Sequence, residues 1–468
     1  MLTFFRINSI FQVITLFLIL FLIRLPFWAS PLPLLNSELE QMLVGQKLNE
    51  GMKLYSEILT QTGPLSAYFF RLLDLWATKN QFVYDTVATI LVVIESLMFV
   101  FMVNRRNLFN DKNYIPGLIY LILIHLSFDM VKLSPILLSN LFFLMALNAT
   151  LRQIEKRDGV GDDVFETGLY FGIATLFYFP AGIFIIFSVF VLFLYTGINI
   201  RQTFMVILAF ILPIFFTYMF FYFNDMSEEF TSVWLFNFPQ FSAFSWLKLK
   251  DLIFVIVLPV LLTFFGVIKV LRGTRYNSFQ NRSHQMLLIL IIFSVITFFM
   301  SGDLTPGKLL FLMAPLAFFV SGYFVHSKNL LIPELTFLFF FFVSVTLFIT
   351  GARPIAGFSL PILKDARAEQ TTDYEKYLGK KIFVTGSQIE SYKNLNMATG
   401  YVNWELARLD FENPDNYMSL ANIYNNFKKD MPEVIIDNEK VMPVIFKNLP
   451  ELGEKYKKED SEVYFLKN

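Results

Sequence analysis

Two carboxylates spaced two positions apart, Glu38 and Glu40, follow the first strongly apolar segment of the chain. A carboxylate held within reach of a hydroxyl group can take its proton and act as a general base. The same residues also fit a structural role. Ser37 and Glu40 have the S-x-x-E spacing of a capping box, and Glu38 would lie in the first helical turn, where the helix dipole favours a negative charge. The local sequence leaves catalysis and helix capping open for this pair.

Three cations lie near the ends of predicted apolar segments, where a lipid phosphate would be met. Lys308 follows Gly307 and begins a predicted helix, so a phosphate there would meet an ammonium charge and backbone N–H groups together. Arg24 lies near the outer end of the first apolar segment, and Arg71 lies in the loop 30–81 that follows this segment. For both arginines, a side chain that only extends to the membrane surface fits at least equally well.

Glu95 is the most central acidic residue of the predicted spans. A charge at that depth costs about 2.5–3.5 kcal/mol on insertion scales, so its side chain should face a partner or water. We expect it to pack inside the bundle.

The composition indicates a protein that lies in a lipid bilayer. Of 468 residues, 55% are hydrophobic and 16% are charged, whereas soluble domains average about 25% charged residues. A helix crosses a membrane with about 20 apolar residues, which predicts about eleven spans if shorter ones are accepted. The spans are expected near 8–29, 82–103, 114–128, 135–150, 165–180, 182–198, 204–222, 251–271, 286–300, 308–324 and 331–351.

Several classes of site and partner are disfavoured by the composition. The formal net charge is zero, so there is no electrostatic reason to expect nucleic acid binding. The chain has no cysteine, which removes disulfides, thiol catalysis and cysteine metal sites. The three histidines, His125, His284 and His326, are not spaced as a metal pair. The apolar N-terminal segment lacks a small-residue cleavage site, so we interpret it as a retained span.

Basic residues in the short loops fall on one side of the predicted membrane, which makes that side cytoplasmic. This arrangement places the N-terminus in the cytoplasm and puts the loop 30–81 and the C-terminus outside it. The predicted location is a bacterial inner membrane, with a periplasmic C-terminus. The basic residues on the cytoplasmic side are Arg6, Arg105, Arg106, Arg152, Lys156, Arg157, Arg201, Arg272, Arg275, Arg282 and Lys328.

The chain divides by composition into a membrane bundle, 1–351, which includes the external loop 30–81, and an external domain, 352–468. The second part is rich in charged residues. Strands are expected at 380–386, 432–438 and 461–468, and a capped helix at 413–430, which together predict a small α/β domain.

The external loop itself should form two amphipathic helices at the membrane surface. Leu39, Met42 and Leu43 make an apolar stripe, and Gly51 is a typical helix stop. Pro64 is suited to the first position of a second helix.

This order of features resembles the first external loop of the GT-C membrane glycosyltransferases, a superfamily that includes protein O-mannosyltransferases and lipid A aminoarabinose transferases. There, an acidic motif follows the first span, and then come a helix ending in Gly, a Tyr, and a Pro-Leu that opens the next helix. In "LNSELEQMLVGQKLNEGMKLYSEILTQTGPL" Glu38 matches the second residue of the family's Asp-Glu motif. Ser37 takes the Asp position, which departs from the family, and Glu38 with Glu40 is the available substitute.

Later segments resemble the same superfamily in order. "SFDMVKLSPILLSN" (from Ser127) resembles the second external loop, with Asp129 as a second acidic residue, and "FETGLYFGIATLFYFPAG" (from Phe165) resembles the Gly-rich fifth span. "GKLLFLMAPLAFF" (from Gly307) resembles a late motif with a basic residue at the outer membrane edge, a position that Lys308 takes. "MPEVIIDN" (from Met431) resembles a strand of the external domain.

The resemblance implies an α-helical polytopic enzyme that moves a sugar from a polyprenyl-phosphate carrier to an acceptor hydroxyl on the non-cytoplasmic face. Glu38 or Glu40 would be the base, with Asp129 as a further catalytic residue. Lys308, with Arg24 or Arg71, would neutralise the leaving phosphate. No cofactor is expected, and a divalent metal stays open.

Two other functions remain open on the sequence. A catalytically inactive GT-C-like scaffold would explain Ser37 and a capping role for Glu40, and its external domain would hold a periplasmic envelope protein. A transporter is a weaker alternative, because the sequence has no evident inverted repeat or paired broken helices.

Overall fold

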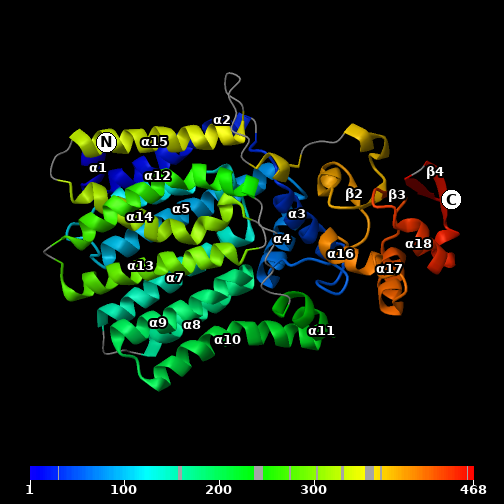
Figure 1. Ribbon diagram of the computed structural model, residues 1–468, viewed down its shortest axis with the longest axis horizontal. Coiled ribbons are helices and arrows are strands. Elements are labelled where there is room, and N and C mark those ends of the chain that lie inside the picture. Colours follow the sequence, from blue (N-terminus) through cyan, green and yellow to red (C-terminus); the bar gives the residue numbers. More distant parts are fainter. Residues whose placement is uncertain are drawn as a thin grey trace. The chain divides into compact units, whose positions relative to one another are not determined.

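A computed structural model describes residues 1–29, 31–156, 161–236, 246–273, 276–301, 304–327, 331–353, 363–368, 372–460 and 462–467. The chain forms two compact units (Figure 1). Unit 1 comprises Met1–Leu32, Gln81–Met219 and Pro239–Lys364, and unit 2 comprises Pro33–Asn80, Phe220–Phe238 and Asp365–Asn468.

Unit 1 is a bundle of apolar helices joined by short connections. Its helices are α1 (Leu2–Phe5), α2 (Ile10–Ala29), α5 (Gln81–Arg105), α6 (Ile115–Ile124), η1 (Phe128–Val131), α7 (Pro135–Lys156), α8 (Gly161–Phe177), η2 (Phe179–Ile183), α9 (Phe184–Thr196), α10 (Ile200–Phe223), α12 (Trp246–Leu271), α13 (Ser278–Phe299), η4 (Pro306–Leu309), α14 (Leu310–Val325) and α15 (Leu331–Ala352).

The protein is a multi-pass helical membrane protein, as the sequence predicted. Within the described residues, eight helices are long and apolar enough to cross a bilayer, and two shorter apolar helices accompany them. Each of the eleven predicted apolar segments coincides with helix. The number of spans and their orientation stay predictions.

Burial in unit 1 follows the pattern of a bundle surrounded by lipid. Helix α14 is buried along nearly its whole length, whereas α10 and α12 expose many large apolar side chains. Small residues allow close helix contacts. Gly168 and Gly172 form a G-x-x-x-G pair on α8, and an added Cβ would lie 2.1 Å from the Val206 oxygen and 2.4 Å from the Phe210 oxygen of α10.

Unit 2 contains both helices of the external loop, α3 (Asn36–Asn49) and α4 (Pro64–Ala77). Pro64 is the first residue of α4, as predicted. Gly51 ends α3 with φ +88°, and the bond from the Met52 N–H to the Lys47 oxygen (3.1 Å) closes the last turn. The prediction of the helix stop is therefore confirmed.

The predicted capping box at Ser37 and Glu40 is wrong. Helix α3 begins one residue earlier, at Asn36, with Leu35 as its N-cap and no side-chain cap bond. Leu35 is held instead in extended backbone by a bridge to Arg367. The helix is also not amphipathic, because both its polar and apolar side chains are buried. Helix α4 does have an exposed apolar face, formed by Leu72, Leu75 and Trp76.

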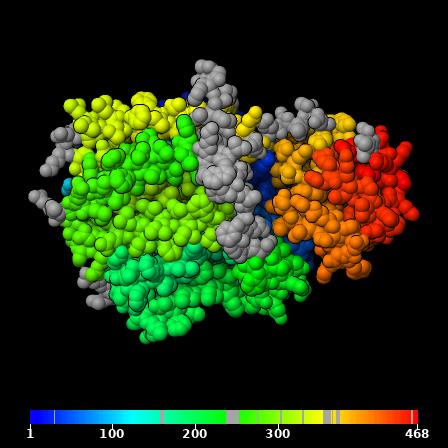
Figure 2. Space-filling view, viewed as in Figure 1, coloured from blue at the N-terminus to red at the C-terminus, as the bar shows by residue number. Residues whose placement is uncertain are grey.

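The C-terminal part of unit 2 is an α/β fold with a five-stranded sheet in the order β2-β1-β3-β5-β4. Strands β1 and β3 are parallel, with Ile382 opposite Val434, and β3 and β5 are antiparallel. Figure 2 shows the orange and red residues of this part as one contiguous body. The strands are β1 (Lys381–Thr385), β2 (Asn396–Met397), β3 (Val434–Asp437), β4 (Tyr456–Asp460) and β5 (Val463–Leu466).

Short helices pack against this sheet around a core that includes Phe383, Phe427 and Ile435. The predicted strands at β1, β3 and β5 and the helix α17, capped by the side chain of Asn416, are confirmed. The helices of this part are η5 (Lys364–Ala366), η6 (Thr372–Tyr377), η7 (Ile389–Lys393), α16 (Trp404–Phe411), α17 (Tyr417–Lys429), α18 (Met442–Asn448) and α19 (Pro450–Gly453).

The units divide the chain differently from the predicted domains. The sequence placed 30–81 with the bundle, but 33–80 belongs with the C-terminal residues. The end of α10 from Phe220 onward belongs to the same unit, together with α11 (Ser227–Glu229) and η3 (Phe230–Leu235). There Phe221 and Phe230 pack against Tyr55, with ring centroids 5.5 and 6.0 Å away.

Candidate functional site

Asp129 joins two short helices of unit 1 that are far apart in sequence. It lies in η1 and is 6% exposed. Its Oδ2 accepts a hydrogen bond of 2.5 Å from the backbone N–H of Gly307 at the start of η4, and its Oδ1 accepts one from the Ser127 hydroxyl. Burial raises the pKa of Asp129, although these bonds and the charge of Lys308 act in the opposite direction. A buried acid is therefore held beside the predicted anion-binding lysine.

Lys308 follows Gly307 in η4, and its side chain is half-buried. Its Nζ lies 5.1 Å from the centroid of the Tyr178 ring, and the Tyr178 hydroxyl donates a bond of 2.7 Å to the Ser301 hydroxyl. Asp129 and Lys308 are thus brought together from separate parts of the sequence, with Tyr178 beside them.

Arg24 is buried and bonded to protein groups. Its Nε–H points to Nε2 of His125 at 3.4 Å, Nη1 donates to the Thr89 hydroxyl, and Nη2 lies 3.5 Å from the Val131 oxygen. Nδ1 of His125 contacts the Leu121 oxygen at 2.8 Å, which makes it the donor nitrogen and leaves Nε2 to accept from Arg24. These contacts favour a structural role for Arg24, holding the end of α2 against α5 and η1.

Lys132, just after η1, is buried and forms an ion pair of 2.9 Å with the part-buried Asp85 of α5. The pair anchors the connection between η1 and α7 to α5. The two residues are 47 positions apart, so no local spacing in the sequence indicates this contact.

The two carboxylates of the external loop lie in unit 2 and are buried to different degrees. Glu38 is 3% exposed on α3. Glu40 is half-buried, and its Oε1 accepts from the Thr60 hydroxyl at 3.3 Å and from the Asn403 amide at 3.5 Å. Glu40 thus connects the loop to the start of α16.

Arg71 also lies in unit 2, exposed on α4. Its Nε donates to Oδ1 of Asn49 at 3.2 Å, and the Asn49 amide donates to the Asp74 carboxylate at 2.8 Å. Arg71 therefore takes part in the contact between α3 and α4.

Sequence reasoning missed the most buried charge of unit 2, Lys47. Its side chain is fully buried, and its Nζ donates to Asp430 at 2.8 Å, Glu50 at 2.7 Å and the Met397 oxygen at 2.6 Å. Burial alone would raise the pKa of Asp430, but the bonds from Lys381 and Lys47 outweigh it and hold that pKa below its usual value. The network fastens α3 to the C-terminal fold.

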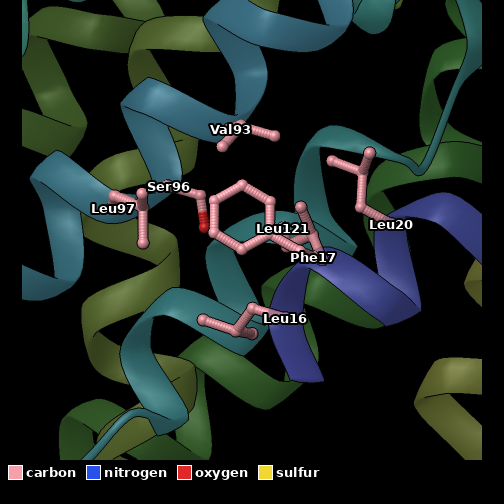
Figure 3. A pocket seen from close by; sticks show the side chains of 7 residues that line it. All are labelled: Leu16, Phe17, Leu20, Val93, Ser96, Leu97 and Leu121. Carbon is pink, nitrogen blue, oxygen red and sulfur yellow. The ribbon is translucent and has the colours of Figure 1, made fainter. Parts of the chain in front are cut away.

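A small recess in unit 1 offers no place for a phosphate. It lies between α2, α5 and α6 and is lined mainly by apolar side chains (Figure 3). Ser96 is its one polar lining residue, and its hydroxyl donates to the Gly117 oxygen at 3.0 Å. The other lining residues are Leu16, Phe17, Leu20, Val93, Leu97 and Leu121.

Metal ligands do not cluster in the part of the chain that the structure describes, where no group of three or more His, Asp or Glu residues is placed to hold an ion. The candidate chemistry of unit 1 thus rests on Asp129, Lys308 and their hydrogen-bonded neighbours.

A family model, described as a family of unknown function, DUF6427, matches residues 63–355, which is more than half of the 468 residues. The chain belongs to the DUF6427 family. The part shared with DUF6427 contains Arg71, Asp129 and Lys308 but begins after Arg24, Glu38 and Glu40. No match was found among curated proteins.

Proposed function

We propose that the protein is a GT-C-like glycosyltransferase that moves a sugar from a polyprenyl-phosphate carrier to an acceptor hydroxyl on the non-cytoplasmic face of a bacterial inner membrane. The observation that carries the proposal is the bond between Asp129 and the Gly307 N–H. It puts the second acidic residue of the resemblance beside the late basic residue, Lys308, although 179 positions separate the two in the chain.

The chemistry requires a base and a group that stabilises the leaving phosphate. The base takes the proton of the acceptor hydroxyl, whose oxygen bonds to the sugar carbon while the bond from that carbon to the carrier phosphate breaks. Lys308 supplies positive charge as the phosphate leaves with the electron pair. Asp129 is the candidate base in unit 1, since its raised pKa brings it closer to the pH at which a general base works best.

The proposal includes an arrangement in the membrane. About eleven apolar helices cross it, the N-terminus lies in the cytoplasm, and unit 2 with the C-terminus lies in the periplasm. The one-sided distribution of Lys and Arg in the short loops supports this orientation.

A second candidate function is a catalytically inactive scaffold that binds an envelope protein through the C-terminal domain. Three observations favour it. Ser37 stands where the resemblance requires Asp, Glu38 is buried on α3, and Glu40 is hydrogen-bonded to Thr60 and Asn403. In this function the carboxylates hold the fold of unit 2.

The two functions are separated by measuring carrier-linked sugars in cells. If the protein is the transferase, a deletion strain should accumulate a polyprenyl-phosphate-linked sugar, detected by mass spectrometry of lipid extracts. The parent gene should clear it, and Asp129→Asn should not, because loss of a general base slows a reaction by about 10²–10⁴-fold. Glu38→Gln and Glu40→Gln test the loop carboxylates in the same strain.

Asp163→Asn is the matched control, because Asp163 is a buried carboxylate of unit 1 that forms ion pairs with Arg152 and Lys156. It should clear the lipid as the parent does. If the deletion strain accumulates no carrier-linked sugar, the transferase proposal is wrong. If Asp129→Asn clears the lipid normally, Asp129 is not the base.

A further inference from the structure

Glu95 lies in the middle of α5, and its carboxyl group is fully buried. Fourteen residues of α5 precede it and ten follow, which places it about 21 Å and 15 Å from the helix ends. It belongs neither to the Asp129–Lys308 cluster nor to the residues assigned to transfer chemistry. A carboxylate this deep in a membrane bundle is costly to keep charged.

The groups that contact Glu95 are neutral. Its Oε2 accepts a bond of 2.9 Å from the side-chain amide of Asn140 on α7, and the Tyr120 hydroxyl of α6 lies 3.4 Å from the same oxygen. The Asn140 amide also contacts the Tyr120 hydroxyl at 2.9 Å. All three side chains are fully buried. The triad is therefore a closed polar cluster inside an apolar bundle.

Two oxygens of this cluster have no hydrogen-bond partner among the described residues, Oε1 of Glu95 and Oδ1 of Asn140. An ionised carboxylate would spread a full negative charge over the two oxygens of Glu95, of which Oε1 has no hydrogen-bond partner among the described residues. A protonated carboxyl group carries no charge and can donate to an amide oxygen, since the oxygen and nitrogen of Asn140 can exchange places by rotation of the amide.

The cations bonded to α5 lie away from Glu95. Arg24 binds Thr89 and Lys132 binds Asp85, six and ten residues earlier, which is about 9 Å and 15 Å along the helix. Helices α6, α7 and η1 pack against α5. From these elements the titratable group that reaches the carboxyl group is Tyr120, which is neutral at physiological pH. A proton is the remaining means of neutralising Glu95 within the described contacts.

We propose that Glu95, Tyr120 and Asn140 form an intramembrane proton-binding site, in which Glu95 is a carboxylic acid at neutral pH and can exchange its proton. The site is separate from the proposed glycosyl transfer. It gives the bundle a charge that can be switched at mid-membrane by gain or loss of a proton, a role that such residues have in proton relays.

Infrared difference spectroscopy of the parent protein and Glu95→Gln, both in lipid nanodiscs at neutral pH, reads the protonation state directly. The parent should show the carbonyl band of a carboxylic acid that Glu95→Gln lacks, and the band should shift when H₂O is replaced by D₂O. Absence of the band overturns the proposal. If the band is present but does not shift in D₂O, the proton on Glu95 does not exchange, which overturns the proposal of an exchangeable proton site.

Labelling with dicyclohexylcarbodiimide, an apolar reagent that reacts with protonated carboxyl groups, gives a second test on the unmodified sequence. The carboxyl oxygen bonds to the central carbon of the reagent, and the acid proton moves to its nitrogen. Peptide mass spectrometry should find the adduct on Glu95 and not on Asp85, which is paired with Lys132. An adduct on Asp85 but not on Glu95 contradicts the proposal, and neither result depends on whether Glu95→Gln folds.

Discussion

The carboxylate of Asp129 and the backbone N–H of Gly307 hold two short helices together across 178 positions of the chain. Nothing larger than hydrogen fits on the Gly307 Cα without disturbing this contact, because an added Cβ would lie 2.9 Å from Asp129 Oδ2. This contact therefore fixes the position of Lys308, the residue that follows Gly307.

Gly307→Ala should lower the free energy of unfolding by about 1–3 kcal/mol, the usual cost of overpacking a filled site. The thermal midpoint of the purified protein measures it. The same substitution in an Asp129→Ala background is the matched control, because the crowded carboxylate is then absent and the added cost should shrink. Equal costs in both backgrounds would show that the carboxylate is not the source of the strain.

Asp129→Asn should change how stability depends on pH. The raised pKa means that the folded protein keeps this proton to a higher pH than the unfolded chain, in which Asp titrates near pH 3.9. The stabilisation by the proton is complete below the unfolded pKa and is lost as the pH rises through the folded pKa. Asn resembles the protonated acid and does not titrate, so the stability of the variant should not decrease in this way as the pH rises.

Thermal midpoints of parent and Asp129→Asn, measured from about pH 4 to pH 8, check this prediction. The parent should lose stability relative to the variant as the pH rises. Parallel curves would mean that the Asp129 carboxyl group does not carry a raised pKa.

Lys47→Met should destabilise unit 2 by about 3 kcal/mol, because it removes a fully buried partner of Asp430 and Glu50. Lys381→Met is the control, since Lys381 also pairs with Asp430 but its side chain is 52% exposed, and less than about 1 kcal/mol is expected there. Limited proteolysis of the full chain at increasing urea concentrations measures the loss of stability for both variants. A similar loss for both variants would argue against a special role of burial at Lys47.

Trp76 should contact lipid, because it is 85% exposed on the apolar face of α4, and α5 starts five residues later. The chain has no cysteine, so Trp76→Cys and the control Lys457→Cys, on an exposed position of β4, can each carry one environment-sensitive fluorophore. In nanodiscs the probe at position 76 should emit at shorter wavelength than the probe at position 457. Equal emission at both positions would place this face of α4 in water.

The helices of the bundle were predictable because a run of about 20 apolar residues indicates a membrane-spanning helix, whether its side chains face lipid or other helices. The apolar segment around Leu310–Val325 and the Gly-rich segment around Gly168 both appear as expected. The start of α3 was not predictable from Ser37 and Glu40. Its first turn is fixed by the bridge between Leu35 and Arg367, a contact across more than 300 residues that no local spacing encodes.

The candidate site was predictable in its residues but not in its grouping. Asp129 and Lys308 were chosen from the order of motifs, and only the fold places η1 against η4. Arg24 was chosen as a cation near the membrane surface, but in the fold its guanidinium group is hydrogen-bonded to His125 and Thr89. Lys47 was not among the candidates, because its partner, Asp430, lies 383 positions later and no local spacing connects the two.

The most direct test of the central claim is the affinity of Lys308→Ala for polyprenyl phosphate, measured by native mass spectrometry of the protein in nanodiscs with increasing amounts of the lipid. Loss of a charge-assisted contact to phosphate should raise Kd by about 10–100-fold. Lys269→Ala is the matched control, since Lys269 also lies over a tyrosine ring, that of Tyr323 at 3.7 Å, but belongs to another part of unit 1. The proposed function predicts weaker binding for Lys308→Ala and parent-like binding for Lys269→Ala. Equal affinity of Lys308→Ala and the parent would contradict a polyprenyl-phosphate site at Lys308.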